Sequence, residues 1–144
     1  MLDRLGQADR FAGGGAILAI VASLLPWYHF DDGSDRITEN AFGSGFWGDM
    51  VFLCGAAMLF VLLVRHGVIA LRADLGSRTI DIAIGGIAML AVVLQLLIGV
   101  NGSGAFHHAT IGIAVALAAS AAMVAGAWLR GSPAGHPVAA SRRR

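Results

Sequence analysis

Three histidines are the residues of this sequence whose type and position best suit metal chemistry. His29 follows the first apolar run, and His107 and His108 precede the last one. Imidazole nitrogens and carboxylates together form transition-metal sites. The segment after the first run supplies the carboxylates of Asp31, Asp32, Asp35 and Glu39, and the start of the second run supplies that of Asp49. Adjacent helical residues point about 100° apart, however, and neither HxxxH nor HxH spacing occurs. We therefore predict no metal and no cofactor, with these three histidines as the alternative ligands.

Few other polar side chains fall within the apolar runs. Gln95 is the most polar residue at depth, and we expect it to hydrogen-bond a neighbouring helix. A role in lining a substrate path is the alternative. Asp49 and Asp81 fall in the first turns of their runs, where a carboxylate caps a helix N-terminus and meets the positive end of its dipole. No buried ionisable group is expected in the runs.

Several function classes lack their characteristic residues. The single cysteine, Cys54, excludes a CxxC redox pair. No Walker sequence, paired carboxylates or Ser-His-Asp arrangement can be assembled on one face of a membrane. A net charge of +1 does not suggest nucleic-acid binding. The chain is therefore predicted to have no catalytic residues, not to be an enzyme and to bind no nucleic acid.

Four apolar runs must position these residues. The chain has 57% hydrophobic and 13% charged residues, whereas soluble domains carry about 25% charge. The runs cover about residues 11–27, 47–64, 80–100 and 108–129, and in lipid such runs must be helical. We predict an all-α transmembrane four-helix bundle over residues 1–130 and a disordered cytoplasmic tail over 131–144. A cleaved signal peptide is the alternative for the first run, although Asp3 and Asp9 cancel its positive charge.

Arginine positions set the expected orientation. Nine of the ten basic residues lie before the first run, between the second and third, or after the fourth. The positive-inside rule then places both termini in the cytoplasm of a cell whose plasma membrane holds the protein. The segment from about 28 to 46 becomes a flexible extracytoplasmic loop. Its ends carry aromatic residues that we expect to anchor it at the interface: Trp27, Tyr28, Phe30, Phe42, Phe46 and Trp47.

Small residues predict how the helices meet, because close backbone approach drives helix association in lipid. The last run has two rows at i, i+4 spacing. The predicted packing residues are Gly112, Ala116 and Ser120 in one row, Ala118, Ala122 and Gly126 in the other, and Gly85 and Gly86 in the third run. Small residues around more than one face of the last helix favour a homo-oligomer or a membrane-protein partner in addition to the lipid bilayer.

Short motifs resemble those of a known group of proteins. Leu24-Leu25-Pro26-Trp27-Tyr28 closes the first run, Ala41-Phe42-Gly43 precedes the second, and Ala125-Gly126-Ala127-Trp128-Leu129-Arg130 ends the fourth. Over about residues 10 to 130 the chain resembles small, uncharacterised four-span membrane proteins of high-GC Gram-positive bacteria. The resemblance implies topology and a bacterial origin, and carries no activity.

These observations favour a non-enzymatic multi-pass protein, an accessory or scaffold subunit whose helices pack against other membrane helices. A small oligomeric transporter or channel, with Gln95 and the outer histidines along its path, is the first alternative. An extracytoplasmic sensor that uses the acidic loop is the second.

Overall fold

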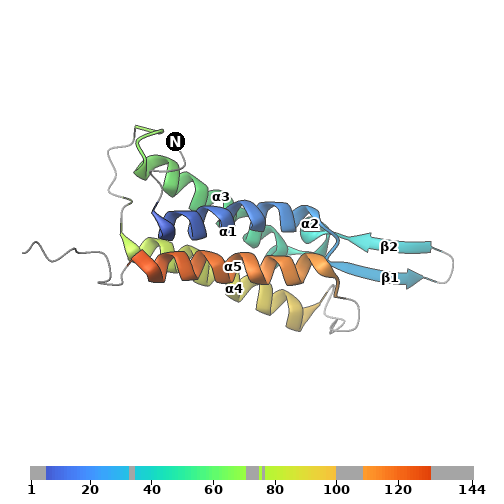
Figure 1. Ribbon diagram of the computed structural model, residues 1–144. Coiled ribbons are helices and arrows are strands. Elements are labelled where there is room, and N and C mark those ends of the chain that lie inside the picture. Colours follow the sequence, from blue (N-terminus) through green and yellow to red (C-terminus); the bar gives the residue numbers. More distant parts are fainter. Residues whose placement is uncertain (1–5, 33–34, 71–74, 76, 100–108, 131–144) are drawn as a thin grey trace, which may run out of the picture.

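A computed structural model describes residues 6–32, 35–70, 75, 77–99 and 109–130. The elements are α1 (Gln7–Leu24), β1 (Tyr28–Asp32), β2 (Asp35–Glu39), α2 (Ala41–Ser44), α3 (Phe46–Arg65), α4 (Arg78–Ile98) and α5 (Ile111–Arg130). The four long helices lie side by side and alternate in direction (Figure 1). Consequently α1 and α4 begin, and α3 and α5 end, at one end of the bundle, which we call the charged end. The hairpin of β1 and β2 projects from the other, which we call the hairpin end.

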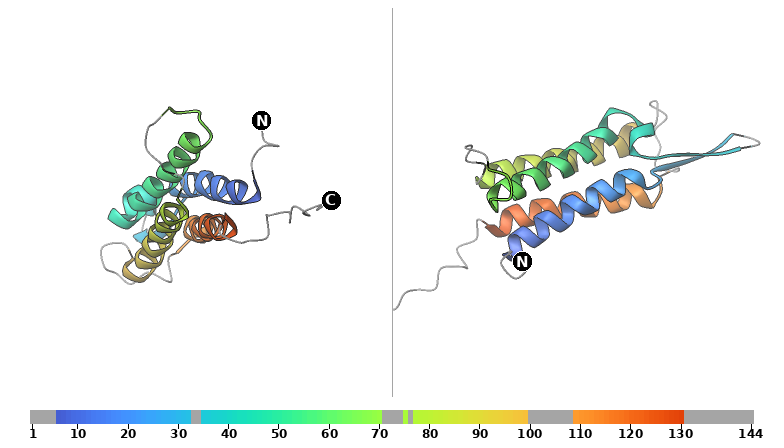
Figure 2. Two further views of the ribbon diagram at one scale, coloured as in Figure 1. Left: turned by 90° about the vertical axis from the view of Figure 1, so that its left-hand side faces the viewer. Right: turned by 90° about the horizontal axis from the view of Figure 1, so that it is seen from above.

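The long helices form a ring in which each one contacts two neighbours. Seen along the bundle, the order is α1, α5, α4, α3 (Figure 2). The most extensive contact is between α1 and α5, because both helices present small residues to each other. Ala12, Ala16 and Ala19 of α1 are fully buried, and Gly15 lies directly against the backbone of α5 around Ala119. The core is thin and closely packed, as expected of helices that associate in lipid.

Three helices are long and apolar enough to cross a membrane among those that the structure describes. They are α3, α4 and α5, with mean hydropathies of 2.1, 2.3 and 1.9. They correspond to the second, third and fourth predicted runs. α1 is not among them, because its 18 residues include Gln7, Asp9, Arg10 and three consecutive glycines, which lower its mean hydropathy. Length and composition therefore support three of the four predicted spans, and α1 is not one of them.

The helix boundaries differ from the predicted ones where proline and glycine act. α1 ends at Leu24, not near Trp27, because Leu25 precedes Pro26 and is extended, with ψ of 158°. α4 ends at Ile98 because Gly99 adopts a φ of 69°, which terminates a helix and favours glycine. The last helix begins at Ile111 and not at His108, which lies outside the described residues.

The prediction of a purely helical fold is wrong between α1 and α3, where a loop was expected and two strands are present. β1 and β2 pair antiparallel from Tyr28 opposite Glu39 to Asp32 opposite Asp35. The Trp27 N–H continues this ladder at the base of the hairpin by donating to the carbonyl of Glu39 at 2.7 Å, and the Gly112 N–H of α5 donates to the Pro26 carbonyl at 3.0 Å, which joins the hairpin base to the bundle. Backbone pairing of this kind gives the segment a defined register that its glycine content does not suggest.

Two of the predicted interfacial aromatic residues belong to the core. Trp27 and Tyr28 are fully buried at the hairpin end. The indole Nε1 of Trp27 donates to the carbonyl of Ala22 at 2.7 Å, so its polar atom needs no water. Phe42 and Phe46 are exposed, as anchors would be, and Trp47 is half-buried. The side chain of Phe30 lies outside the described part of the structure.

Candidate functional site

A cluster of buried charges lies at the charged end of the bundle and joins its four long helices. Asp81 of α4 is 0% exposed. Arg65 Nη2 of α3 donates to Asp81 Oδ1 at 2.9 Å, and Arg130 Nη1 of α5 lies 2.6 Å from Asp81 Oδ2. Arg130 also donates to Asp9 of α1. We call Asp9, Arg65, Asp81 and Arg130 the charge cluster.

Helix direction explains why these residue types meet there. Asp9 and Asp81 lie in the first turns of α1 and α4, while Arg65 and Arg130 lie in the last turns of α3 and α5. A carboxylate at a helix N-terminus and a guanidinium at a C-terminus are each favoured by the helix dipole. Because the helices alternate in direction, two acidic starts and two basic ends converge on one end, and their formal charges cancel.

The expectation that no ionisable group is buried in the runs is wrong at Asp81, as is the expectation that Asp81 caps its helix. The α4 cap is Ser77, whose side chain accepts from the Ile80 N–H. Asp81 instead accepts from Arg65 across the bundle. Asp49 is half-buried in the first turn of α3. The N-cap residue of that helix is Gly45, which has no side chain to form a cap hydrogen bond.

The periphery of the charge cluster is partly open. The side chains of Asp9, Arg65 and Arg130 are 16%, 16% and 20% exposed. His66 Nε2 lies 3.4 Å from Asp9 Oδ2, and Arg65 Nη2 also donates to the Leu75 carbonyl at 3.2 Å. Burying paired charges costs desolvation energy that the pairing only partly repays, whereas removing one partner is strongly destabilising. We therefore expect the charge cluster to constrain helix register more than it adds net stability.

A second polar group lies at the hairpin end, around Gln95. This side chain is 1% exposed, and its Nε2 donates to the carbonyls of Ser44 at 2.9 Å and Gly99 at 3.3 Å. The hydroxyl of Tyr28 donates to the backbone carbonyl of Gln95 at 2.7 Å. The expected hydrogen bond to a neighbouring element is thus present, and its acceptor belongs to the short helix α2. Gln95 ties α4 to α2 and, through its carbonyl, to β1.

The pKa of Tyr28 provides a test of this group. Burial raises the pKa of the Tyr28 hydroxyl above its ordinary value of 10.0, and an interaction with the side-chain amide of Gln95 lowers the pKa by less. Tyr28 is the one tyrosine of the chain, so absorbance at the phenolate band reports it alone. We expect a midpoint above 10.0 in the folded protein.

Because the folded-state pKa is the higher one, the protonated hydroxyl contributes stability that is complete below the unfolded-state pKa. This contribution is lost as pH rises through the folded-state pKa. Tyr28→Phe removes the phenolate signal and serves as the control. A folded-state midpoint at or below that of the unfolded chain would contradict burial of this hydroxyl.

The candidate metal ligands are not brought together in the described part of the chain. His29 is exposed on β1 and its Nδ1 lies 3.1 Å from Thr38 Oγ1. His107 and His108 lie outside the described residues. No group of three His, Cys, Asp or Glu side chains that could hold a metal occurs within the described ranges. Cys54 is a buried free thiol on α3.

The predicted packing residues divide into buried and exposed sets. One row of α5 faces the core, with Gly112, Ala116 and Ser120 all buried. In the other row Gly126 is buried, Ala122 is half-buried and Ala118 is exposed. The neighbouring glycines of α4 divide in the same way. A Cβ on Gly85 would meet Val124 at 3.0 Å, whereas a Cβ on Gly86 would meet nothing within 4 Å.

Sequence reasoning missed the core residues Ala119, Met123 and Ala127 of α5 and the role of Arg65 and Arg130 as partners of Asp81. The positions of Asp9, Arg65, Asp81 and Arg130, each at the end of a run, were the signal that could have identified the charge cluster. No protein-family model, curated protein or solved structure matches the chain. The resemblance to small bacterial four-span proteins therefore stays a prediction.

Proposed function

We propose that the chain is a non-enzymatic four-span protein of the bacterial plasma membrane, an accessory or scaffold subunit that packs against other membrane helices. Both termini face the cytoplasm in this proposal. Its support comes from the arginine distribution, from the lengths of the helices and from small residues on the outer surface that no described part of the protein covers.

The length, outer surface and neighbours of α1 support its assignment as a fourth membrane span. Its 18 residues extend about 27 Å, close to the thickness of a hydrocarbon core of about 30 Å. Its outer face exposes Ile17, Leu18, Val21 and Leu24, side chains that suit lipid. Asp9 is paired with Arg130, which reduces the cost of placing it near the membrane. α1 also lies along α5, a candidate span, and therefore occupies the same depth.

The outer face of α4 presents a regular seam. Its residues are all exposed and recur at alternating steps of three and four: Ala83, Gly86, Leu90, Val93 and Leu97. This spacing is that of the contact positions of helices packed with a left-handed crossing. Ala83 and Gly86 form its thin end, where a second backbone can approach closely. We call these five residues the α4 seam.

The main support for the proposal is that Gly86 is an exposed glycine of the α4 seam. Glycine within a helix costs about 1 kcal/mol relative to alanine, and proteins accept this cost where backbones must approach closely. Gly85, Gly15 and Gly126 each have such a neighbour. Gly86 has none among the described residues, although a Cβ there would fit freely. A neighbouring membrane helix supplies the missing contact.

A photo-activated cross-linking residue on the α4 seam tests this directly. Placed at Leu90 in cells, it should cross-link a membrane protein, and the same residue at Leu53 of α3 is the matched control, since both leucines are 56% exposed. Purification in mild detergent should retain the same partner, or a second copy of this chain. Gly86→Leu should reduce its recovery about tenfold, because overpacking costs 1–3 kcal/mol or more at about 1.4 kcal/mol per tenfold.

Two results would count against the proposal. One is a monomer without a co-purifying protein in several mild detergents. The other is equal cross-linking from Leu90 and Leu53. The transporter alternative gains no support from Gln95, because both hydrogens of its amide are directed at backbone carbonyls within the bundle.

A further inference from the structure

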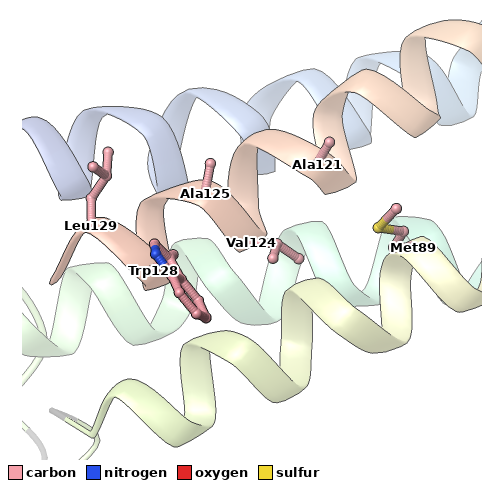
Figure 3. A pocket seen from close by; sticks show the side chains of 6 residues that line it. All are labelled: Met89, Ala121, Val124, Ala125, Trp128 and Leu129. Atoms are coloured by element: carbon pink, nitrogen blue, oxygen red, sulfur yellow. The ribbon is translucent and has the colours of Figure 1, made fainter. Parts of the chain in front are cut away.

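A shallow apolar groove runs between α4 and α5 on the outer surface. Its lining residues are Met89, Ala121, Val124, Ala125, Trp128 and Leu129. In Figure 3 the ring of Trp128 projects from α5 toward α4, and Met89 of α4 lies toward the other end of the groove. None of these residues belongs to the α4 seam. The small side chains of Ala121 and Ala125 leave the depression, while the large ring bounds it near the charged end.

An arginine side chain lies at the Trp128 end of this groove. Arg78 is the first residue of α4, and its Cζ lies 5.1 Å from the centroid of the Trp128 ring. Arg65 and Arg130 are neutralised by Asp81 and Asp9. Arg78, by contrast, forms no ion pair with any residue that the structure describes. Its Nε is buried without a hydrogen-bond partner in that part of the protein, as are nitrogens of Arg65 and Arg130, so the missing ion pair is what distinguishes it. The positive charge at this point is therefore uncompensated by the described part of the protein.

From this juxtaposition we propose that the groove binds an anionic phospholipid, with an acyl chain along Ala121 and Ala125 and the phosphate at Arg78. The proposal rests on the membrane location of the bundle but not on a protein partner. A guanidinium donates two parallel hydrogen bonds to a phosphate. Tryptophan and arginine are both favoured at the depth of the headgroups.

Charge complementarity decides between a lipid and a helix in this groove. An apolar helix docked over Trp128 would bury the guanidinium of Arg78 without a counter-charge, which is costly. A phosphate at the membrane surface pairs with it instead. The preference for a net anionic lipid follows because the choline or ethanolamine group of a zwitterionic lipid brings a second cation close to Arg78.

Native mass spectrometry of the delipidated full-length protein tests the site. Phosphatidylglycerol should bind more tightly than phosphatidylcholine. Arg78→Gln should weaken phosphatidylglycerol binding about fivefold, the worth of one basic residue at a membrane surface, and leave phosphatidylcholine binding unchanged. Arg10→Gln is the matched control, since it removes one charge at the same end from an exposed position on α1. Its binding should match that of the unaltered protein.

Equal weakening by Arg78→Gln and Arg10→Gln would overturn the proposal in favour of general charge attraction. Equal affinity for the two lipids would overturn it as well. The apolar half of the site is tested by quenching with brominated phosphatidylglycerol in vesicles. Trp128 should account for most of the quenched fluorescence, as judged by Trp128→Phe, and Ala125→Leu should reduce the quenching by filling the groove. Ala125 is exposed, so this variant should retain its helical content, and unchanged quenching would contradict the assigned position.

Discussion

Asp81→Asn is expected to lower the free energy of unfolding by about 3–5 kcal/mol, because it removes one partner from a buried ion-pair network. The substitution keeps the shape of the side chain and leaves Arg65 and Arg130 facing a neutral amide. The partial exposure of both arginines places the loss toward the lower end of this range. Even so, it is a large fraction of the 5–15 kcal/mol typical of folded domains. Loss of helical circular dichroism in a titration with denaturing detergent measures it.

Two variants show whether the loss comes from the charge cluster. Asp49→Asn removes a carboxylate from the first turn of α3, at the hairpin end, and should change the free energy of unfolding by no more than about 0.5 kcal/mol. Arg65→Gln combined with Asp81→Asn should cost less than the sum of the two single changes, because the residues share one interaction. Additive losses would show that Asp81 and Arg65 act independently, contrary to the structure.

Gly126→Ala is expected to destabilise the bundle by about 1–3 kcal/mol or more, the cost of overpacking. The added methyl group would lie 2.6 Å from the Ala12 nitrogen and 2.7 Å from the Ala8 carbonyl oxygen. Both are backbone atoms, so no side chain can rotate away, and α1 must move from α5 along their closest contact. The same detergent titration measures the loss, and the half of α1 at the charged end should become the more accessible to proteolysis.

Gly86→Ala supplies the matched control with the opposite sign. A methyl group there meets nothing within 4 Å, so the isolated protein should gain up to about 1 kcal/mol from helix propensity alone. Gly85→Ala, one residue earlier, should be less favourable than Gly86→Ala but milder than Gly126→Ala, because its methyl group would meet Val124 at 3.0 Å. Equal effects at Gly85 and Gly86 would mean that α4 is rotated from the orientation described.

Much of the helical architecture could be read from hydrophobicity. The second run was expected at about 47–64 and the helix spans Phe46–Arg65, because a long uncharged run leaves the chain few other ways to satisfy its backbone in lipid. The hairpin was not anticipated. The first strand alternates in Tyr28, His29, Phe30 and Asp31, and the second carries the β-branched Ile37 and Thr38, but the glycine and charges around them favoured a loop.

The charge cluster and the orientation of α4 could not be predicted from hydrophobicity. Asp9 and Arg130 are 121 positions apart in sequence, and only the ring of four helices brings them together. Likewise, periodicity could identify Gly85 and Gly86 as small residues, but it could not say which of two adjacent glycines faces a neighbour. That depends on the rotation of α4 about its own axis, which the packing of α5 decides.

The placement of the charges along the chain and their pairing between helices therefore have different causes. The sequence by itself determined that acidic residues begin three of the apolar runs and that basic residues end two, since the helix dipole favours each placement locally. The sequence also determined that much of the protein surface is apolar and therefore unfavourable in water. Only the tertiary structure decided that Asp81 is buried between Arg65 and Arg130 while Arg78 has no counter-charge among the described residues. The reason is that pairing depends on distances between helices, and those distances are set by the small side chains through which the helices pack.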